Sequence, residues 1–337
     1  MHFLITGHTG FKGAWLSMLL EMRGHTVSGI ALEPEPESLY VRANVTKFLK
    51  NDFRCDIREL SKLNSCFAAI NPDIVVHLAA QALVRESYKN PVYTFETNVI
   101  GTINVVKASQ QVNDLKAQLI ITTDKVYKNM DKVTGYRETD ELGGIDPYSA
   151  SKAMADIGVQ SWLSSLDNPP TVIARAGNVI GGGDICTDRL IPDLIRNYSS
   201  GLAPSLRAPT SIRPWQHVLD CLNGYLLLID SALDGTAEGA WNFGPDENQL
   251  KTVADVANIA GALWGADKNW ETDLEAHPYE ASMLILNSDK ARTQLGWSDK
   301  LSFEESVGWT INWYKNVENG HDPLEETLKN IRDFESK

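Results

Sequence analysis

Short apolar runs alternate with longer amphipathic segments through the first half of the chain. Two of these runs, Ile74–Ala79 and Leu119–Thr123, are dominated by leucine and β-branched residues. Strands buried on both faces of a parallel sheet have this composition. Further strands are expected at 2–5, 26–32 and 171–175, and helices at 14–20, 57–70, 94–112 and 149–166. The alternation predicts an α/β fold built on a Rossmann-type, doubly wound parallel sheet.

The pattern changes after Arg175. Three successive glycines at 181–183 open a stretch punctuated by four prolines, and helical periodicity returns at 218–234, 252–264 and 303–317. This change predicts a smaller, partly discontinuous α/β lobe that binds the substrate. We expect a sheet domain over 1–174, rejoined by about 215–245 through a strand near 241–244. The lobe then comprises 175–214 and 246–330.

Charge and cysteine content exclude several classes of partner. The net charge is −13, which disfavours a nucleic-acid partner because such proteins present a basic face. No apolar run is long enough to span a membrane, and the N-terminus lacks a basic leader, so a cytoplasmic location is expected. The four cysteines (Cys55, Cys66, Cys186 and Cys221) form no C-x-x-C pair and have no histidines at metal-ligand spacing, so no metal is expected.

Glycines follow the first predicted strand with the spacing of a dinucleotide-binding loop. Gly7, Gly10 and Gly13 lie between that strand and the first helix. Glycine permits a tight turn there and lets backbone N–H groups approach a pyrophosphate. The second strand ends in 33–37, which contains three glutamates, and no basic residue follows until Arg42. These acidic residues would repel a 2′-phosphate, so NAD is predicted rather than NADP.

A second group of residues predicts the reaction. Tyr148 and Lys152 are four residues apart at the start of a predicted helix, so they share one face. A phenol with a pKa of ~10 becomes a useful base when that pKa falls, and we expect the Lys152 ammonium and a nicotinamide cation to lower it. Thr123 ends a buried strand nearby. Asp124 and Lys125 add an acid and a base that simple oxidation would not need.

Five segments and the Tyr148-x-x-x-Lys152 pair carry a resemblance to a known family. They are Gly7–Gly13, His77–Gln81, Thr97–Thr102, Arg175–Asp184 and Arg213–Val218. The sequence resembles the nucleotide-sugar 4,6-dehydratases of the extended short-chain dehydrogenase/reductase family. In its Asp124-Lys125 pair it is similar to the branch that acts on CDP-glucose.

The resemblance implies NAD-dependent conversion of CDP-D-glucose to CDP-4-keto-6-deoxy-D-glucose and water. C4 is oxidised, water leaves across C5 and C6, and hydride returns to C6. The reaction belongs to deoxysugar biosynthesis, such as that of lipopolysaccharide O-antigen. The family's homodimers or homotetramers assemble through the helices at 94–112 and 149–166.

The resemblance also implies roles for individual residues. Tyr148, Lys152 and Thr123 serve hydride transfer, Asp124 is the acid toward the C6 oxygen, and Lys125 is the base at C5. Lysine and aspartate start near pKa ~10.4 and ~3.9, so each pKa must shift by roughly 3 units toward neutrality. The expected cofactor-binding residues are Gly7, Thr9, Gly10, Phe11, Lys12, Gly13, Asp56, Ile57, Leu78, Ala79, Ala80, Gln81, Asn98, Tyr148 and Lys152. The expected substrate-binding residues are Arg85, Ser87, Asn178, Asp188, Arg189, Arg213 and His217.

Other interpretations are compatible with the same residues. A C4 epimerase or 4-reductase would use Tyr148 and Lys152 but not the Asp124-Lys125 pair, and a non-catalytic NAD-binding scaffold would use none of them chemically. Some candidates also have structural alternatives. Asp56 could cap a helix, Asp188 and Arg189 could pair, His217 could be a core histidine, and Lys125 could point to solvent.

Overall fold

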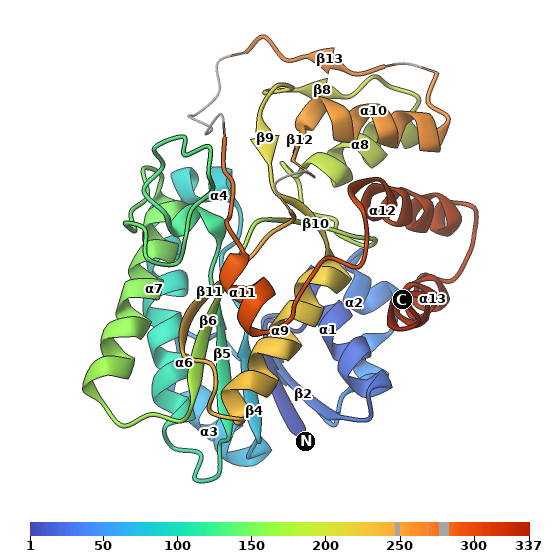
Figure 1. Ribbon diagram of the computed structural model, residues 1–337. Coiled ribbons are helices and arrows are strands. Elements are labelled where there is room, and N and C mark those ends of the chain that lie inside the picture. The colour runs from blue at the N-terminus through green and yellow to red at the C-terminus, as the bar shows by residue number, and fades with distance from the viewer. Residues whose placement is uncertain (247–249, 268, 276–282) are drawn as a thin grey trace.

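The computed structural model describes residues 1–246, 250–267, 269–275 and 283–337. Seven strands form one parallel sheet in the order β11-β6-β5-β4-β1-β2-β3 (Figure 1). They are β1 (His2–Thr6), β2 (Thr26–Ala31), β3 (Asn51–Arg54), β4 (Ile74–His77), β5 (Ala117–Ile121), β6 (Thr171–Ala176) and β11 (Gly239–Phe243). The predicted doubly wound parallel sheet is therefore confirmed. The strand order reverses between β1 and β4, where ligands bind in sheets of this type.

Helices cover both faces of the sheet. Side chains along a strand alternate between faces, so Leu4 packs into one cluster while Phe3 and Ile5 pack into another. Helices α3 (Leu60–Ile70), α6 (Gly101–Ser109) and α7 (Pro147–Ser165) lie on the Leu4 face. The other face is covered by α1 (Phe11–Met22) and α9 (Val218–Leu233).

The predicted helix over 94–112 is three consecutive segments. Helix α5 (Pro91–Phe95) leads into a π-helix, η2 (Glu96–Ile100), and then into α6. Inside the π-helix, Asn98 accepts a hydrogen bond from the Gln81 amide at 2.8 Å and donates to Ser151 Oγ at 2.9 Å. Through Asn98, the π-helix thus links the segment after β4 to helix α7. The sequence pattern predicted a regular amphipathic helix, which needs no such irregular turn.

The later part of the chain forms a lobe above the sheet. Its helices are α8 (Leu190–Ser199), α10 (Val253–Trp264) and α12 (Phe303–Glu318), and the last helix, α13 (Pro323–Glu335), packs against α12 and α1. Short strands pair there as β7 (Asn178–Ile180) with β10 (Trp215–His217), β8 (Ser205–Leu206) with β13 (Glu271–Thr272), and β9 (Ile212–Arg213) with β12 (Lys251–Thr252). Strand β11 pairs with β6, so the chain returns to the sheet between lobe segments. The exact domain boundaries stay a prediction, and α8 and α13 were not predicted.

Short elements complete the described fold. They are α2 (Leu39–Arg42), η1 (Val45–Phe48), α4 (Val84–Lys89), η3 (Asp124–Val126) and α11 (Asp289–Gln294). Among the described residues, no helix combines the length and apolar character needed to cross a bilayer.

A buried ion pair fixes α7 against the sheet. Arg175 of β6 donates from Nε and Nη2 to Asp156 of α7 at 2.9 and 2.7 Å, and both side chains are at most 1% exposed. Thr122, just after β5, donates to the same carboxylate at 3.0 Å. Helix α7 carries Tyr148 and Lys152, so the Asp156–Arg175 ion pair fixes the position of these two residues beside the end of β5.

Candidate active site

A cavity of about 920 Å³ lies at the carboxyl ends of β1, β4, β5 and β6, beneath the lobe. Most of the predicted site residues line it. They are Gly7, Thr9, Gly10, Phe11, Lys12, Gly13, Asp56, Ile57, Leu78, Ala79, Ala80, Gln81, Arg85, Thr123, Asp124, Lys125, Tyr148, Asn178, Asp188, Arg189 and Arg213. Ser87, Asn98, Lys152 and His217 do not belong to its wall.

The glycine loop is shaped by close backbone packing. Gly7 has φ of +80°, and a Cβ there would lie 2.7 Å from the Ala79 amide nitrogen. A Cβ on Gly13 would lie 2.3 Å from the Gly7 carbonyl oxygen. Helix α1 begins beyond Gly10, with no side-chain cap on its first N–H groups. The loop thus offers uncapped donors and a positive dipole end to an anion in the cavity.

Acidic residues surround the ends of β2 and β3. Glu35 lines the cavity, whereas the Glu33 side chain is 81% exposed and pairs with Arg54 at 3.2 Å. The Arg54 guanidinium also donates to Asp52 at 3.0 Å. The Arg54 guanidinium therefore adds a positive charge at this end of the sheet, and the carboxylates of Glu33 and Asp52 pair with it.

Asp56 lines the same end of the cavity without capping a helix. Its Oδ1 accepts the Arg58 N–H at 2.9 Å, and its Oδ2 pairs with the Arg58 guanidinium at 2.7 Å. The N-cap of α3 is Glu59 instead. Asp56 is therefore part of a local turn at the cavity wall.

Strand β5 delivers Thr123 and Asp124 to the centre of the cavity. Thr123 caps η3 and donates from Oγ1 to Asp124 Oδ1 at 2.9 Å. The Asp124 residue is 2% exposed, and its Oδ2 has no hydrogen-bond partner among the described residues. Burial raises the pKa of Asp124, although Lys125, Thr123 and Arg213 all oppose this rise. Burial therefore favours the protonated carboxyl that an acid needs.

Tyr148 and Lys152 follow the start of α7. Asp146 caps this helix by accepting the Ser149 N–H at 2.9 Å, and Pro147 begins it. Lys152 is 4% exposed, and its Nζ donates to the Ile121 carbonyl at 2.9 Å, behind the cavity wall. Burial lowers the pKa of Lys152 to about 8.

The expected lowering of the Tyr148 pKa by Lys152 is not found. Burial raises the pKa of Tyr148 to about 12, and a hydrogen bond with Thr123 and the charge of Arg189 act against that rise. The Lys152 ammonium donates to the Ile121 carbonyl, and the main influences on the pKa of the phenol come from burial and other groups. A further positive charge is needed to lower the pKa of Tyr148 toward neutral pH.

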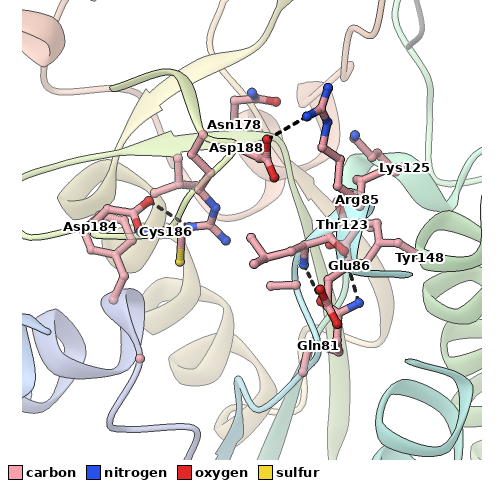
Figure 2. Close-up of a pocket in the computed structure, with 18 of the residues that line it drawn as sticks. Gln81, Arg85, Glu86, Thr123, Lys125, Tyr148, Asn178, Asp184, Cys186 and Asp188 are labelled. Atoms are coloured by element: carbon pink, nitrogen blue, oxygen red, sulfur yellow. Dashed lines mark hydrogen bonds and ion pairs between the residues drawn. The ribbon is translucent and has the colours of Figure 1, made fainter. Parts of the chain in front are cut away.

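Lys125 belongs to the cavity rather than to the outer surface. Figure 2 shows Thr123, Lys125 and Tyr148 on the same side of the cavity. Within the described part of the chain, the Lys125 ammonium makes no hydrogen bond or ion pair, and it lies near enough to Asp124 to act on its pKa. The alternative that Lys125 points away from the site does not match this placement.

Ion pairs organise the lobe side of the cavity. Asp188 pairs with Arg85 at 3.2 Å, shown in Figure 2, and with Arg207 at 3.4 Å. Arg189 pairs with Asp184 at 2.8 Å. Asp188 and Arg189 thus have separate partners, and the suggested pair between them is not formed. Arg207 and Asp184 were not predicted as site residues.

Comparison with known proteins places this geometry in a family. The family described as GDP-mannose 4,6 dehydratase matches residues 4–310. The chain belongs to this dehydratase family. It is 41% identical to a CDP-glucose 4,6-dehydratase of Salmonella typhimurium over 98% of this chain and 95% of that protein. It is 27% identical to a dTDP-glucose 4,6-dehydratase of Mycolicibacterium smegmatis, over 98% of both. The resemblance expected from the motifs is confirmed.

Solved structures of similar fold include other nucleotide-sugar enzymes. A UDP-glucose 4-epimerase of Thermus thermophilus, in complex with NAD, matches 94% of this chain and all of that one, with a TM-score of 0.81 and 24% identity. A dTDP-glucose 4,6-dehydratase of Bacillus anthracis, also in complex with NAD, matches 96% of this chain and 99% of that one. Its TM-score is 0.79 and its identity 23%. These likenesses support the fold.

In this member of the dehydratase family, the predicted residues outside the wall hold other groups in place. Ser87 Oγ accepts the Tyr148 N–H at 3.1 Å, and Asn98 joins Gln81 to Ser151. His217 caps α9 by accepting the Leu219 N–H at 3.2 Å. Burial lowers its pKa to about 3, which keeps the ring neutral. Direct contact of these three residues with a ligand stays a prediction.

Proposed function

We propose that this protein removes water from CDP-D-glucose in an NAD-dependent reaction that yields CDP-4-keto-6-deoxy-D-glucose. The observation that carries the proposal is that Asp124 and Lys125 line the same cavity as Thr123 and Tyr148, with Asp124 hydrogen-bonded to Thr123. The 41% identity to a CDP-glucose 4,6-dehydratase supports the nucleotide and the reaction. Simple oxidation at C4 would not require the acid Asp124 or the base Lys125.

The cavity residues fit NAD. The glycine loop packs so tightly that a Cβ on Gly7 or Gly13 would meet neighbouring backbone, and the uncapped start of α1 suits a pyrophosphate. Glu35 at the end of β2 would repel a 2′-phosphate. When bound, NAD supplies the hydride acceptor for oxidation at C4 and the hydride donor for reduction at C6. Its nicotinamide cation is also the further positive charge that Tyr148 requires.

The side chains divide the proton transfers among them. Tyr148 removes the proton from the C4 hydroxyl, assisted by its hydrogen bond with Thr123. The resulting 4-ketone acidifies the C5 hydrogen, which Lys125 removes as a proton and returns to C5 when hydride is added at C6. Asp124 gives its proton to the C6 oxygen, which leaves as water. Asp124 Oδ2 is buried and has no hydrogen-bond partner among the described residues. It suits this role because burial raises the pKa of Asp124 and so favours the protonated carboxyl, which can donate toward a substrate oxygen.

Product mass decides between this function and its alternatives. The protein is incubated with NAD and, separately, CDP-, UDP- and dTDP-glucose. Loss of one water from CDP-glucose is expected. Unchanged mass with inverted C4 stereochemistry would indicate an epimerase. A separate incubation with a 4-keto nucleotide sugar and NADH tests for a reductase, which would add two hydrogens. No reaction with any of the sugars would indicate a non-catalytic scaffold.

The proposal extends to assembly and setting. Four apolar side chains on α5, η2 and α7 are at least half exposed, namely Val92 (69%), Ile100 (53%), Met154 (51%) and Ile157 (50%). We propose that this face joins two copies in a homodimer or homotetramer. Ile157→Glu would then shift the mass measured by light scattering toward the monomer.

We also propose that the protein is a cytoplasmic enzyme of deoxysugar biosynthesis, such as that of lipopolysaccharide O-antigen.

A further inference from the structure

The short turn η3, which carries Asp124 and Lys125, is held only weakly by its own hydrogen bonds. The Val126 amide nitrogen lies 3.3 Å from the Thr123 carbonyl oxygen, and the Tyr127 amide nitrogen lies 3.5 Å from that of Asp124. The Thr123 side chain accepts the Lys125 N–H at 3.4 Å. Hydrogen bonds of this length are weak, and a single 3₁₀ turn has few others. The positions of Asp124 and Lys125 therefore depend on the residues that flank the turn.

Tyr127 ends the turn, and its side chain is anchored in the sheet. The residue is 2% exposed. Its hydroxyl donates to Asn242 Oδ1 at 2.7 Å and accepts a hydrogen bond from Arg175 Nη1 at 2.9 Å. Asn242 and Arg175 are register partners on the neighbouring strands β11 and β6 (Figure 1). Two adjacent strands thus hold one hydroxyl group that belongs to the segment after β5.

The amide of Asn242 is itself fixed in orientation. Asn242 is fully buried, and its Nδ2 donates to the backbone carbonyls of Tyr136 at 2.8 Å and Asn287 at 3.1 Å. With the amide nitrogen facing two acceptors, Oδ1 must face the Tyr127 hydroxyl. Burial raises the pKa of Tyr127, so this hydroxyl keeps the proton that it donates. The bond between Tyr127 and Asn242 is therefore a fixed attachment point for the end of η3.

Arg175 connects the same hydroxyl to helix α7. Its guanidinium pairs with Asp156 of that helix at 2.7 Å, and α7 also carries Tyr148. The Tyr127 hydroxyl thus sets the end of η3 relative to the helix that presents Tyr148. The start of α7 has supports of its own, because Ser87 accepts the Tyr148 N–H at 3.1 Å. Loss of the Tyr127 hydroxyl should therefore disturb η3 more than it disturbs Tyr148.

We propose that Tyr127 is a positioning residue whose hydroxyl holds Asp124 and Lys125 in place for the elimination of water. This inference rests on the proposed function, in which these two residues are the acid and the base. Tyr127 acts through the backbone of η3 and transfers no proton itself. Proton transfer requires the reacting atoms to lie about 3 Å apart, so a small shift of the turn slows elimination. Oxidation at C4 uses Thr123 and Tyr148, which β5 and α7 hold independently.

Tyr127→Phe tests the proposal because it keeps the ring and removes only the hydroxyl. The variant is mixed with NAD and CDP-glucose for a single turnover, with absorbance reporting reduced nicotinamide and product mass reporting water loss. We expect reduced nicotinamide to form at the wild-type rate. Water loss should be slower by about 10-fold or more, the order expected for a misplaced acid and base. Reduced nicotinamide should then accumulate, and KM for CDP-glucose should change little.

Tyr136→Phe is the matched control. Its ring stacks on that of Tyr127 with centroids 5.1 Å apart, and it is also buried, at 3% exposed. Its hydroxyl instead accepts the Met130 N–H at 2.6 Å and donates to Asn129 at 2.8 Å. Removing this hydroxyl should leave both steps at wild-type rates. Thermal melting establishes that each variant is folded at the assay temperature.

The two chemical steps decide the outcome. Unchanged water loss in Tyr127→Phe, or equal slowing of both steps, would overturn the proposal, since a merely structural role would affect the steps alike. If Tyr127→Phe is unfolded, Asn242→Ala takes its place, because it removes the acceptor and keeps the tyrosine. The wild type tests the proposed function separately. If it does not release water from CDP-glucose, the proposed function fails, whereas a wild type that does so with no selective loss in the variant contradicts only the role of Tyr127.

Discussion

The two sides of the cavity are built by different physical means. The cofactor side depends on shape, since Gly7 and Gly13 let the backbone segments after β1 and β4 pack closely. The lobe side depends on charge, with Asp184 and Asp188 holding three arginines at 2.8 to 3.4 Å. Close packing is sensitive to a single methyl group, whereas partly exposed ion pairs contribute little stability and exchange readily. The cofactor side is therefore suited to retaining one ligand, and the lobe side to admitting and releasing another.

Adding a side chain to the glycine loop should have the largest effect. Gly13→Val would place a Cβ 2.3 Å from the Gly7 carbonyl oxygen, and the loop would have to move. We expect loss of measurable NAD binding by calorimetry, and with it loss of all turnover. Gly308→Ala in α12 is the control, because its nearest neighbour would be 4.0 Å away. If Gly13→Val is folded by thermal melting and still binds NAD normally, close packing does not define this side.

Lys125 lines the same cavity, and removal of its amine should separate the chemical steps. Lys125→Met should lower turnover about 100-fold or more, the usual contribution of a positioned base. Reduced nicotinamide should still form in a single turnover, because Tyr148 and Thr123 remain. Absorbance and product mass measure the two steps. Lys128→Met serves as control, since Lys128 pairs with Glu141 away from the cavity. Unimpaired water loss in Lys125→Met would remove Lys125 from the mechanism.

The same contrast decides what could be predicted from the sequence. The glycine spacing and the Tyr148-x-x-x-Lys152 pair are local patterns, so periodicity places the first after β1 and the second at the start of helix α7. The partners of Arg85 and Arg207 could not be found in this way, because Asp188 reaches both only after the lobe folds over the sheet. The raised pKa of Tyr148 was missed for a related reason. Spacing places Lys152 one turn away, but only the fold shows its ammonium bound to the Ile121 carbonyl.

Two ion pairs can be compared directly, one between helix α7 and the sheet and one on the lobe side of the cavity. The side chains of Asp156 and Arg175 are 0% and 1% exposed, whereas those of Asp184 and Arg189 are 6% and 34% exposed. Asp156→Asn should cost about 3–5 kcal/mol of unfolding free energy, because it leaves a buried guanidinium uncompensated. Asp184→Asn should cost about 1 kcal/mol or less. Denaturant unfolding measures both, and equal costs would contradict the proposed difference.

The smallest effect concerns pH. His217 and His77 are both buried, and burial lowers the pKa of each to about 3. Because the folded pKa lies below the ordinary value of 6.5, the stabilisation is complete above pH 6.5 and is lost as pH falls toward 3. Each histidine should contribute a slope of about 1.4 kcal/mol per pH unit in that window.

His217→Asn isolates one of these two contributions. Asparagine keeps an N-cap acceptor for α9 but does not titrate. The variant should be less stable than the wild type at neutral pH, since it loses ring contacts with Trp15 and Trp309. Its stability should then fall less steeply than that of the wild type, by about 1.4 kcal/mol per pH unit, between about pH 6 and pH 5. Parallel slopes for the two proteins would show that His217 does not stay neutral. His77, which lies between Thr6 and Thr102, contributes to the slope that remains in the variant, together with His8 and the other histidines whose pKa is lowered by burial.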